Sequence, residues 1–218
     1  FRSGQSVDRL YILDGCQDGP VRTIAREARK TDTIINYVSK ERLDQLSETH
    51  AHQGVIAQVA AYDYSTVDEI LARAEEKGEA PFLIILDNVE DPHNLGAIIR
   101  TANLAGAHGV IIPKRRAVGL TSTVAKTSAG AINYTPVAKV TNIVRTIEEL
   151  KEKGIWFVCA DMGGESMYKL NLTGPIGLVI GNFSFSSDLD IFFVGSASDM
   201  IFMPCRAMIG SGTVKVSG

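Results

Sequence analysis

A run of five apolar residues, Phe82–Leu86, constrains the fold more than any other stretch of the chain. An uninterrupted apolar run of this length is typical of a parallel strand that is buried on both faces. Asp91-Pro92 then predicts a loop, because proline disfavours helical geometry in the residue before it. Asn94 is expected to cap a helix that runs to about Gly106. The succession of strand, polar loop and helix indicates a candidate site as well as a scaffold.

The expected helix has one apolar face, and Arg100 falls on its opposite side at ~100° per residue. That face is made by residues that recur at helical spacing: Leu95, Ile98, Ile99, Ala102 and Ala105. Taken alone, Arg100 favours a solvated side chain over a functional one.

Strands and helices alternate after residue 81, which predicts a mostly parallel sheet. The further strands are expected at 109–113, 155–160 and 176–182, with an amphipathic helix at 141–153. Ligands of such sheets gather at the carboxyl ends of the strands. The triplet Lys114-Arg115-Arg116 follows one strand there and is expected to contact phosphates. A solvated loop is the alternative.

Residues 1–61 predict a small α/β unit with strands at 10–13, 33–38 and 55–59 and helices at 21–30 and 39–46. The first helix is basic, and its Arg22 and Arg26 are candidate contacts to a polyanion, although a basic helix face is also compatible with simple solvation. His50 and His52 have no third ligand near them, so no metal site is predicted.

Residues 62–80 predict a charged helical linker that separates two cores. A capping box, Thr66 to Glu69, would start its helix, and Gly78 would end it.

Composition allows one large or two small domains, with 218 residues of which 45% are hydrophobic. The net charge of −3 argues against a wholly basic nucleic-acid binder but leaves room for local basic patches. Cys16, Cys159 and Cys205 are widely separated and are expected to be reduced thiols of a cytoplasmic protein. No signal peptide or membrane-crossing run is predicted.

The segment 87–102, DNVEDPHNLGAIIRTA, resembles motif 1 of the SpoU (TrmH-type) RNA ribose 2'-O-methyltransferases of the SPOUT superfamily. The pattern Asp91-Pro92-x-Asn94-x-Gly96-x-x-x-Arg100-Thr101 carries this resemblance, and 176–182 resembles the start of motif 2. His52–Val55 resembles the last strand of the L30e-like domain in the RlmB-like branch. The resemblance implies an incomplete L30e-like domain at 1–61, a catalytic domain with a deep trefoil knot at 81–218 that lacks its C-terminal end, and a homodimer.

The resemblance also implies that S-adenosylmethionine methylates a ribose 2'-hydroxyl, with a guanosine of 23S rRNA as the expected target. A tRNA methyltransferase and a catalytically weakened RNA-binding protein are the alternatives. Arg100 would stabilise negative charge, Asn94 would hold the arginine or the nucleotide, and Ser211 would be a further polar contact. The cofactor would lie against main chain from three loops, at Ala160, Gly181, Ile201, Met203 and Gly212. No metal is required, because the methyl donor carries its own activated group.

The sequence departs from the family's pattern after Asn182. Phe183 stands where motif 2 has a glutamate, and Thr213 interrupts the segment 211–216, which corresponds to motif 3 of the family. Phenylalanine accepts no hydrogen bond, so it cannot replace the glutamate. Divergence with loss of catalysis and an incorrect amino-acid assignment after residue 182 both explain the departure. A nicotinamide-dependent enzyme is disfavoured, because no GxGxxG follows the first strand.

Overall fold

The computed structural model describes residues 6–16, 18–31, 33–47, 51–165, 171–181 and 192–194. The chain divides into two compact units: unit 1 comprises residues 1–63 and 119–121, and unit 2 comprises 64–118 and 122–218. No helix in the described ranges is both long and apolar enough to cross a membrane.

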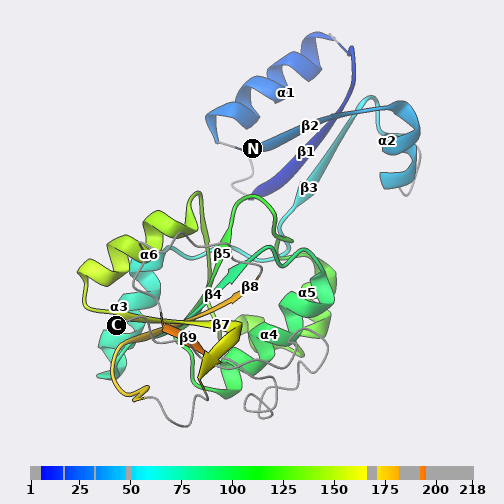
Figure 1. Ribbon diagram of the computed structural model, residues 1–218. Helices are drawn as coiled ribbons and strands as arrows, with labels where there is room; N and C mark the ends of the chain where they lie inside the picture. Colours follow the sequence, from blue (N-terminus) through cyan, green and yellow to red (C-terminus); the bar gives the residue numbers. More distant parts are fainter. Residues whose placement is uncertain are drawn as a thin grey trace. The chain divides into compact units, whose positions relative to one another are not determined.

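Unit 1 is a three-stranded sheet covered by a helix (Figure 1). Its order is β2 (Ile34–Val38), β1 (Val7–Leu13), β3 (Val55–Val59), with β1 parallel to β2 and antiparallel to β3. The helices are α1 (Gly19–Lys30) and α2 (Lys40–Leu46), close to the predicted bounds. The core joins both layers, with Leu10 and Ile12 of β1 against Val21, Ala25 and Ala28 of α1.

Unit 2 is built on a six-stranded sheet in which every pairing is parallel, as the sequence predicts. The spatial order is β6 (Val137–Val140), β5 (Gly109–Pro113), β4 (Phe82–Asp87), β8 (Ile176–Gly181), β7 (Trp156–Glu165) and β9 (Phe192–Val194). Leu83–Leu86 of the central β4 are fully buried, which explains the uninterrupted apolar run.

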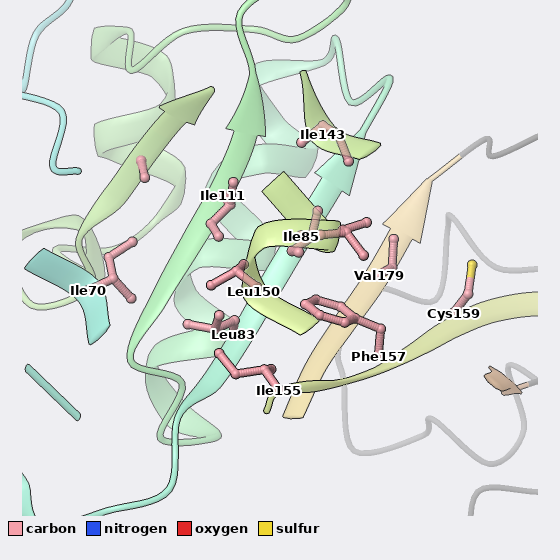
Figure 2. Packing of buried hydrophobic residues seen from close by; sticks show 12 residues of the cluster. Ile70, Leu83, Ile85, Ile111, Ile143, Leu150, Ile155, Phe157, Cys159 and Val179 are labelled. Carbon is pink, nitrogen blue, oxygen red and sulfur yellow. The ribbon is translucent and has the colours of Figure 1, made fainter. Parts of the chain in front are cut away.

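Two helical layers cover this sheet (Figure 1). α3 (Val67–Lys77) and α6 (Ile143–Glu152) lie on one side, and α4 (Pro92–Leu104) with the short α5 (Ser122–Thr127) and the 3-10 turn η1 (Ala131–Asn133) on the other. Figure 2 shows the core of the first side, whose members include Ile70 of α3, Leu150 of α6, Ile111 of β5 and Phe157 of β7.

The expectation that 62–80 is a linker outside both cores is corrected by the packing of α3. The predicted capping box is present, since the Glu69 N–H donates to Thr66 Oγ1 at 3.2 Å and the Thr66 N–H to Glu69 Oε2 at 2.7 Å. However, Ile70 and Ala74 are fully buried in unit 2. Pattern reasoning recognised the helix but not the apolar stripe that docks it.

The helix after β4 begins earlier than predicted, because Asp91 rather than Asn94 is its N-cap. Asp91 Oδ1 accepts the His93 N–H at 2.9 Å, and the Asp91 carbonyl accepts the Leu95 N–H at 3.1 Å. Pro92 suits the first helical position, where its missing N–H costs nothing. The helix ends at Leu104, so the exposed Ala105 does not belong to its buried stripe. The expected knot depends on residues after 181, of which only 192–194 are described.

Candidate functional site at the carboxyl edge of the sheet

Two of the expected cofactor-contacting positions come together at the carboxyl edge of the sheet. β8 lies between β4 and β7, with Asp87 opposite Gly181 and Cys159 opposite Val179. Ala160 therefore follows Cys159 at the height of Ile180, one step from Gly181 on the neighbouring strand. A ligand at this edge would meet main chain from both strands, as ligands of open parallel sheets do.

Left-handed backbone concentrates at the same edge. Asn88, just past β4, has φ 59°, and Arg116, three residues past β5, has φ 56°. Their loops are joined by the Val118 N–H, which donates to the Val89 carbonyl at 3.0 Å. A non-glycine residue in this region costs roughly 1–2 kcal/mol and is often found at functional sites. Asparagine adopts this conformation more readily than most residues, so Asn88 has a local sequence signal, whereas Arg116 has none.

Gly181 has a structural reason to be glycine in addition to any ligand. Its φ is 150°, and a Cβ atom there would lie 2.9 Å from the Asp87 carbonyl carbon and 3.0 Å from the Asp87 nitrogen. Backbone atoms of a central strand cannot move aside, so β4 itself excludes a side chain at this position. Gly181 is nevertheless solvent-exposed, so a planar ligand can approach its main chain closely.

Asp87 places a carboxylate at this edge that the sequence reasoning did not single out. Partial burial raises the pKa of Asp87 above its usual value, while the nearby Arg116 charge and the Asn88 N–H lower it and offset part of the rise. Asp87 ends a strand and precedes a turn, and this is the only sequence signal that marks it.

The basic triplet lies directly after β5, as predicted, but its members differ in exposure. Lys114 is half-buried and its main-chain N–H donates to the Val140 carbonyl at 2.7 Å, whereas Arg115 and Arg116 are exposed. The positive charge of Arg116 also lowers the pKa of the Asp87 carboxyl. Arg115 and Arg116 are thus the members best able to meet a phosphate.

Asn94 and Arg100 are both half-buried on α4. Six residues separate them, which corresponds to roughly 9 Å along the axis and a different side of the helix. No hydrogen bond or ion pair joins the Arg100 guanidinium to another residue in the described ranges. Asn94 therefore does not hold the arginine in this structure.

α4 is held at this edge by close packing on α5. Thr127 Oγ1 donates to the Pro92 carbonyl at 3.3 Å, and a Cβ at Gly96 would lie 2.9 Å from the Val124 carbonyl oxygen. Arg100 follows Gly96 by four residues, so it lies on the same side of α4, one turn further along.

The remaining predicted positions are placed as follows. Arg22 and Arg26 line a hollow of about 380 Å³ on unit 1. Both ring nitrogens of His52 have protein partners, since Nε2 lies 3.0 Å from Asp44 Oδ1 of α2 and Nδ1 accepts the Gly54 N–H at 3.0 Å. In the described part of the chain no group of three or more histidine, cysteine or acidic residues could hold a metal. Ser211, Ile201, Met203 and Gly212, as well as Phe183 and Thr213, lie outside the described residues.

A parallel sheet flanked by helices, with an exposed glycine and adjacent cations at its carboxyl edge, places unit 2 in the class of open α/β folds that bind ligands at that edge. Two family models narrow this class. The SpoU rRNA Methylase family matches residues 81–183, and the RNA 2'-O ribose methyltransferase substrate binding family matches 1–65. The first match ends at Phe183, the residue at which this chain departs from the family's motif 2.

Relatives of similar length support the same conclusion. A Bacillus subtilis (strain 168) protein named as a TrmH family tRNA/rRNA methyltransferase, YacO, is 50% identical over 184 residues, covering 84% of this chain and 73% of that protein. A Staphylococcus epidermidis protein given the same family name is 43% identical over 181 residues, covering 83% and 72%. The chain belongs to the TrmH (SpoU) family of RNA methyltransferases.

Solved structures agree with the fold. The crystal structure of the SpoU methyltransferase AviRb from Streptomyces viridochromogenes, in complex with the cofactor AdoMet, aligns with a TM-score of 0.50 at 20% identity. The alignment covers 100% of this chain and 76% of AviRb. At this identity the likeness concerns the fold alone.

Proposed function

We propose that this protein transfers a methyl group from S-adenosylmethionine to a ribose 2'-hydroxyl of RNA, with a guanosine of 23S rRNA as the target. Family membership supports RNA methylation. The 2'-oxygen is supported by the name of the family that matches residues 1–65, and ribosomal RNA by the name of the family that matches 81–183. We further propose that the enzyme is a cytoplasmic homodimer with a knotted catalytic domain.

The observation that carries this proposal is the meeting of Gly181, Ala160 and the start of α4 at one edge of the sheet. An exposed glycine beside a second strand end suits the flat adenosine of the cofactor, which would lie on main chain there. When bound, S-adenosylmethionine supplies an activated methyl group on a sulfonium, so no metal is needed. AviRb, which shares the fold, is known in complex with this cofactor.

The residues of this chain would then solve a positioning problem, because the ribose oxygen must be aligned with the methyl carbon and its sulfur. A guanidinium stays protonated at neutral pH and is a poor base. Arg100 would therefore stabilise the negative charge that develops on the ribose oxygen and a neighbouring phosphate. Its lack of an ion-pair partner in the described residues leaves its donors available for this role.

The other predicted residues take supporting roles. Asn94 would contact the target nucleotide, and the triplet 114–116 would bind RNA phosphates at the same edge. Ser211 would add a polar contact in motif 3, and Ile201, Met203 and Gly212 would complete the cofactor site. These last four roles depend on the family resemblance, because their positions lie outside the described residues.

A tRNA target is the second candidate, because the curated relatives are named for both tRNA and rRNA. A weakened RNA-binding protein is the third, since Phe183 replaces the glutamate of motif 2.

The test is methyl transfer from tritiated S-adenosylmethionine to ribosomal RNA and, in parallel, to bulk tRNA. Nuclease digestion and mass spectrometry of the labelled RNA would then identify the nucleoside. We expect 2'-O-methylguanosine in 23S rRNA, and no transfer to an RNA fragment with a 2'-deoxy target. Label that persists on the deoxy fragment contradicts the ribose position, and label confined to tRNA favours the second candidate. RNA binding with no transfer to either RNA favours the third.

A further inference from the structure

We propose that unit 1 holds an unpaired nucleotide of the RNA in the hollow between α1 and β2, with Tyr37 stacking on the base and the arginines of α1 binding its phosphates. This inference rests on the proposed function, because it names the kind of RNA that the same enzyme recognises. It concerns an aromatic residue that the sequence pattern did not single out.

The hollow has a volume of about 380 Å³ and combines three kinds of surface. Its floor is apolar and is formed by Ile12 of β1 with Val21 and Ala25 of α1, all buried. Tyr37 of β2 stands at the side and is 53% exposed, so a face of its ring is open to a ligand. Ile12 and Tyr37 are register partners, so the tyrosine lies on the sheet face that α1 covers (Figure 1).

Arginines form the other wall. Arg22, Arg26 and Arg29 occur at positions i, i+4 and i+7 of α1, line the hollow and are exposed. This spacing places the three arginines along one side of the helix, so they can contact phosphates along an RNA strand rather than one phosphate alone. Three guanidiniums beside an apolar floor match a nucleotide, which has an apolar base face and an anionic phosphate.

The contacts within the hollow leave this surface accessible. Arg29 Nη2 donates to Tyr37 Oη at 3.3 Å, which bridges the two walls and orients the ring. Glu27, the acidic residue of α1, lies 2.9 Å from Lys30 Nζ and 3.8 Å from Arg26 Nε. Exposed pairs of this kind are weak, so Arg26 can exchange its carboxylate for a phosphate.

The geometry favours an unpaired nucleotide over a duplex. In an RNA duplex the bases are stacked in the helix and the deep major groove excludes side chains, whereas unpaired bases can turn outward and stack on aromatic rings. A cationic wall alone would bind duplex backbone equally well. A duplex keeps its bases stacked within the helix, so it cannot place a base on the exposed ring above the apolar floor.

Fluorescence anisotropy of the full chain with two labelled probes tests the proposal. The probes are oligouridylate, which forms no secondary structure, and the same strand annealed to oligoadenylate. We expect Tyr37→Ala to weaken binding of the single strand about 5- to 150-fold, as loss of one stacked base does. Tyr37→Phe keeps the ring and should stay within about twofold of the wild type. Tyr134→Ala, at an exposed tyrosine of unit 2, is the matched control.

Salt dependence separates stacking from charge. Tyr37→Ala should leave the slope of log affinity against log salt unchanged, because it removes no cation. Arg26→Gln should reduce that slope by about 0.7, the value for one phosphate contact on a single strand. Arg42→Gln is the control on α2, where Arg42 Nη1 donates to Gln45 Oε1 at 3.1 Å.

A measurement on the unmutated chain guards against variants that fail to fold. Cys16 is half-buried and lines the hollow, whereas Cys159 is buried. Single-stranded RNA should slow modification of Cys16 by a thiol reagent, followed by peptide mass spectrometry, while the duplex should not.

Equal affinity for both probes, an unchanged affinity of Tyr37→Ala or no protection of Cys16 would each overturn the inference. A chain that methylates RNA but shows no Tyr37 effect refutes this inference alone. A chain that binds single strands through Tyr37 but transfers no methyl group refutes the proposed function alone.

Discussion

Replacing Gly96 with alanine tests whether the fit of α4 on α5 sets the position of the candidate site. A Cβ at Gly96 would lie 2.8 Å from Thr127 Cβ and 2.9 Å from the Val124 carbonyl oxygen. The carbonyl is backbone, so it can retreat only if α5 moves. Thr127 is also restrained, because its hydroxyl donates to the carbonyls of Thr123 at 2.9 Å and of Pro92 at 3.3 Å.

The expected cost follows from this lack of room. Overpacking a well-fitted contact by one methyl group costs ~1–3 kcal/mol. At roughly 2–4 °C per kcal/mol for a domain of this size, the melting temperature should fall by about 2–12 °C. A shift of α4 relative to the sheet edge would also displace Arg100, and a displacement of about 1 Å can cost ~100-fold in turnover.

The measurement is thermal unfolding by circular dichroism, followed by methyl transfer at a temperature well below the transition. Gly19→Ala is the matched control, because Gly19 has ordinary backbone and no atom lies within 4 Å of the point that its new Cβ would occupy. Thr127→Ala in the Gly96→Ala background should restore part of the stability, since it removes the hydroxyl nearest the new methyl group.

A melting temperature of Gly96→Ala equal to that of Gly19→Ala would refute this reasoning, because α4 and α5 would then have room for the added methyl group. If the losses of stability caused by Gly96→Ala and by Thr127→Ala simply add in the double variant, the clash does not lie at Thr127.

Three further predictions concern the sheet edge. Arg100→Ala should abolish methyl transfer while calorimetry finds the affinity for S-adenosylmethionine nearly unchanged, and retained turnover would contradict its role. Neutralising 114–116 to glutamine should weaken RNA binding and flatten its salt dependence in filter-binding titrations, whereas an unchanged slope would identify a solvated loop. Burial raises the pKa of Asp87 above its value in the unfolded chain, so folding favours the protonated carboxyl. The stability that this shift contributes is fully present below the unfolded pKa and is lost as pH rises through the folded pKa. Asp87→Asn should therefore gain stability over the wild type in denaturant titrations as pH rises through that window, and a difference independent of pH would argue against the shift.

Short-range patterns predicted the elements of this protein well. The run Phe82–Leu86 became the central strand, and the Thr66 capping box formed with both of its hydrogen bonds. The N-cap of α4 was placed three residues late, because Asp91 and Asn94 are both good caps and only the position of Pro92 decides between them. The position of an N-cap depends on neighbouring residues, so the sequence contains the information that places it.

The site was less predictable. Gly181 and Ala160 were expected from a family resemblance, and strand register then brought them together. The left-handed Arg116 carries no local signal, and the position of Asp87 at a strand end does not reveal its raised pKa, since loop geometry and burial produce these properties.

By itself the sequence determined which segments form strands and helices, where most helices begin and end, and that the sheet is parallel. It did so because those outcomes depend on residues a few positions apart. Only the tertiary structure decided that α3 belongs to the core of unit 2, where Ile70 fills the space that Gly109 leaves open. It likewise decided that Tyr37 meets Arg29 across a hollow. Ile70 and Gly109 are remote along the chain, and Arg29 and Tyr37 belong to different elements although they are only eight positions apart. Both contacts therefore form only after the elements have packed.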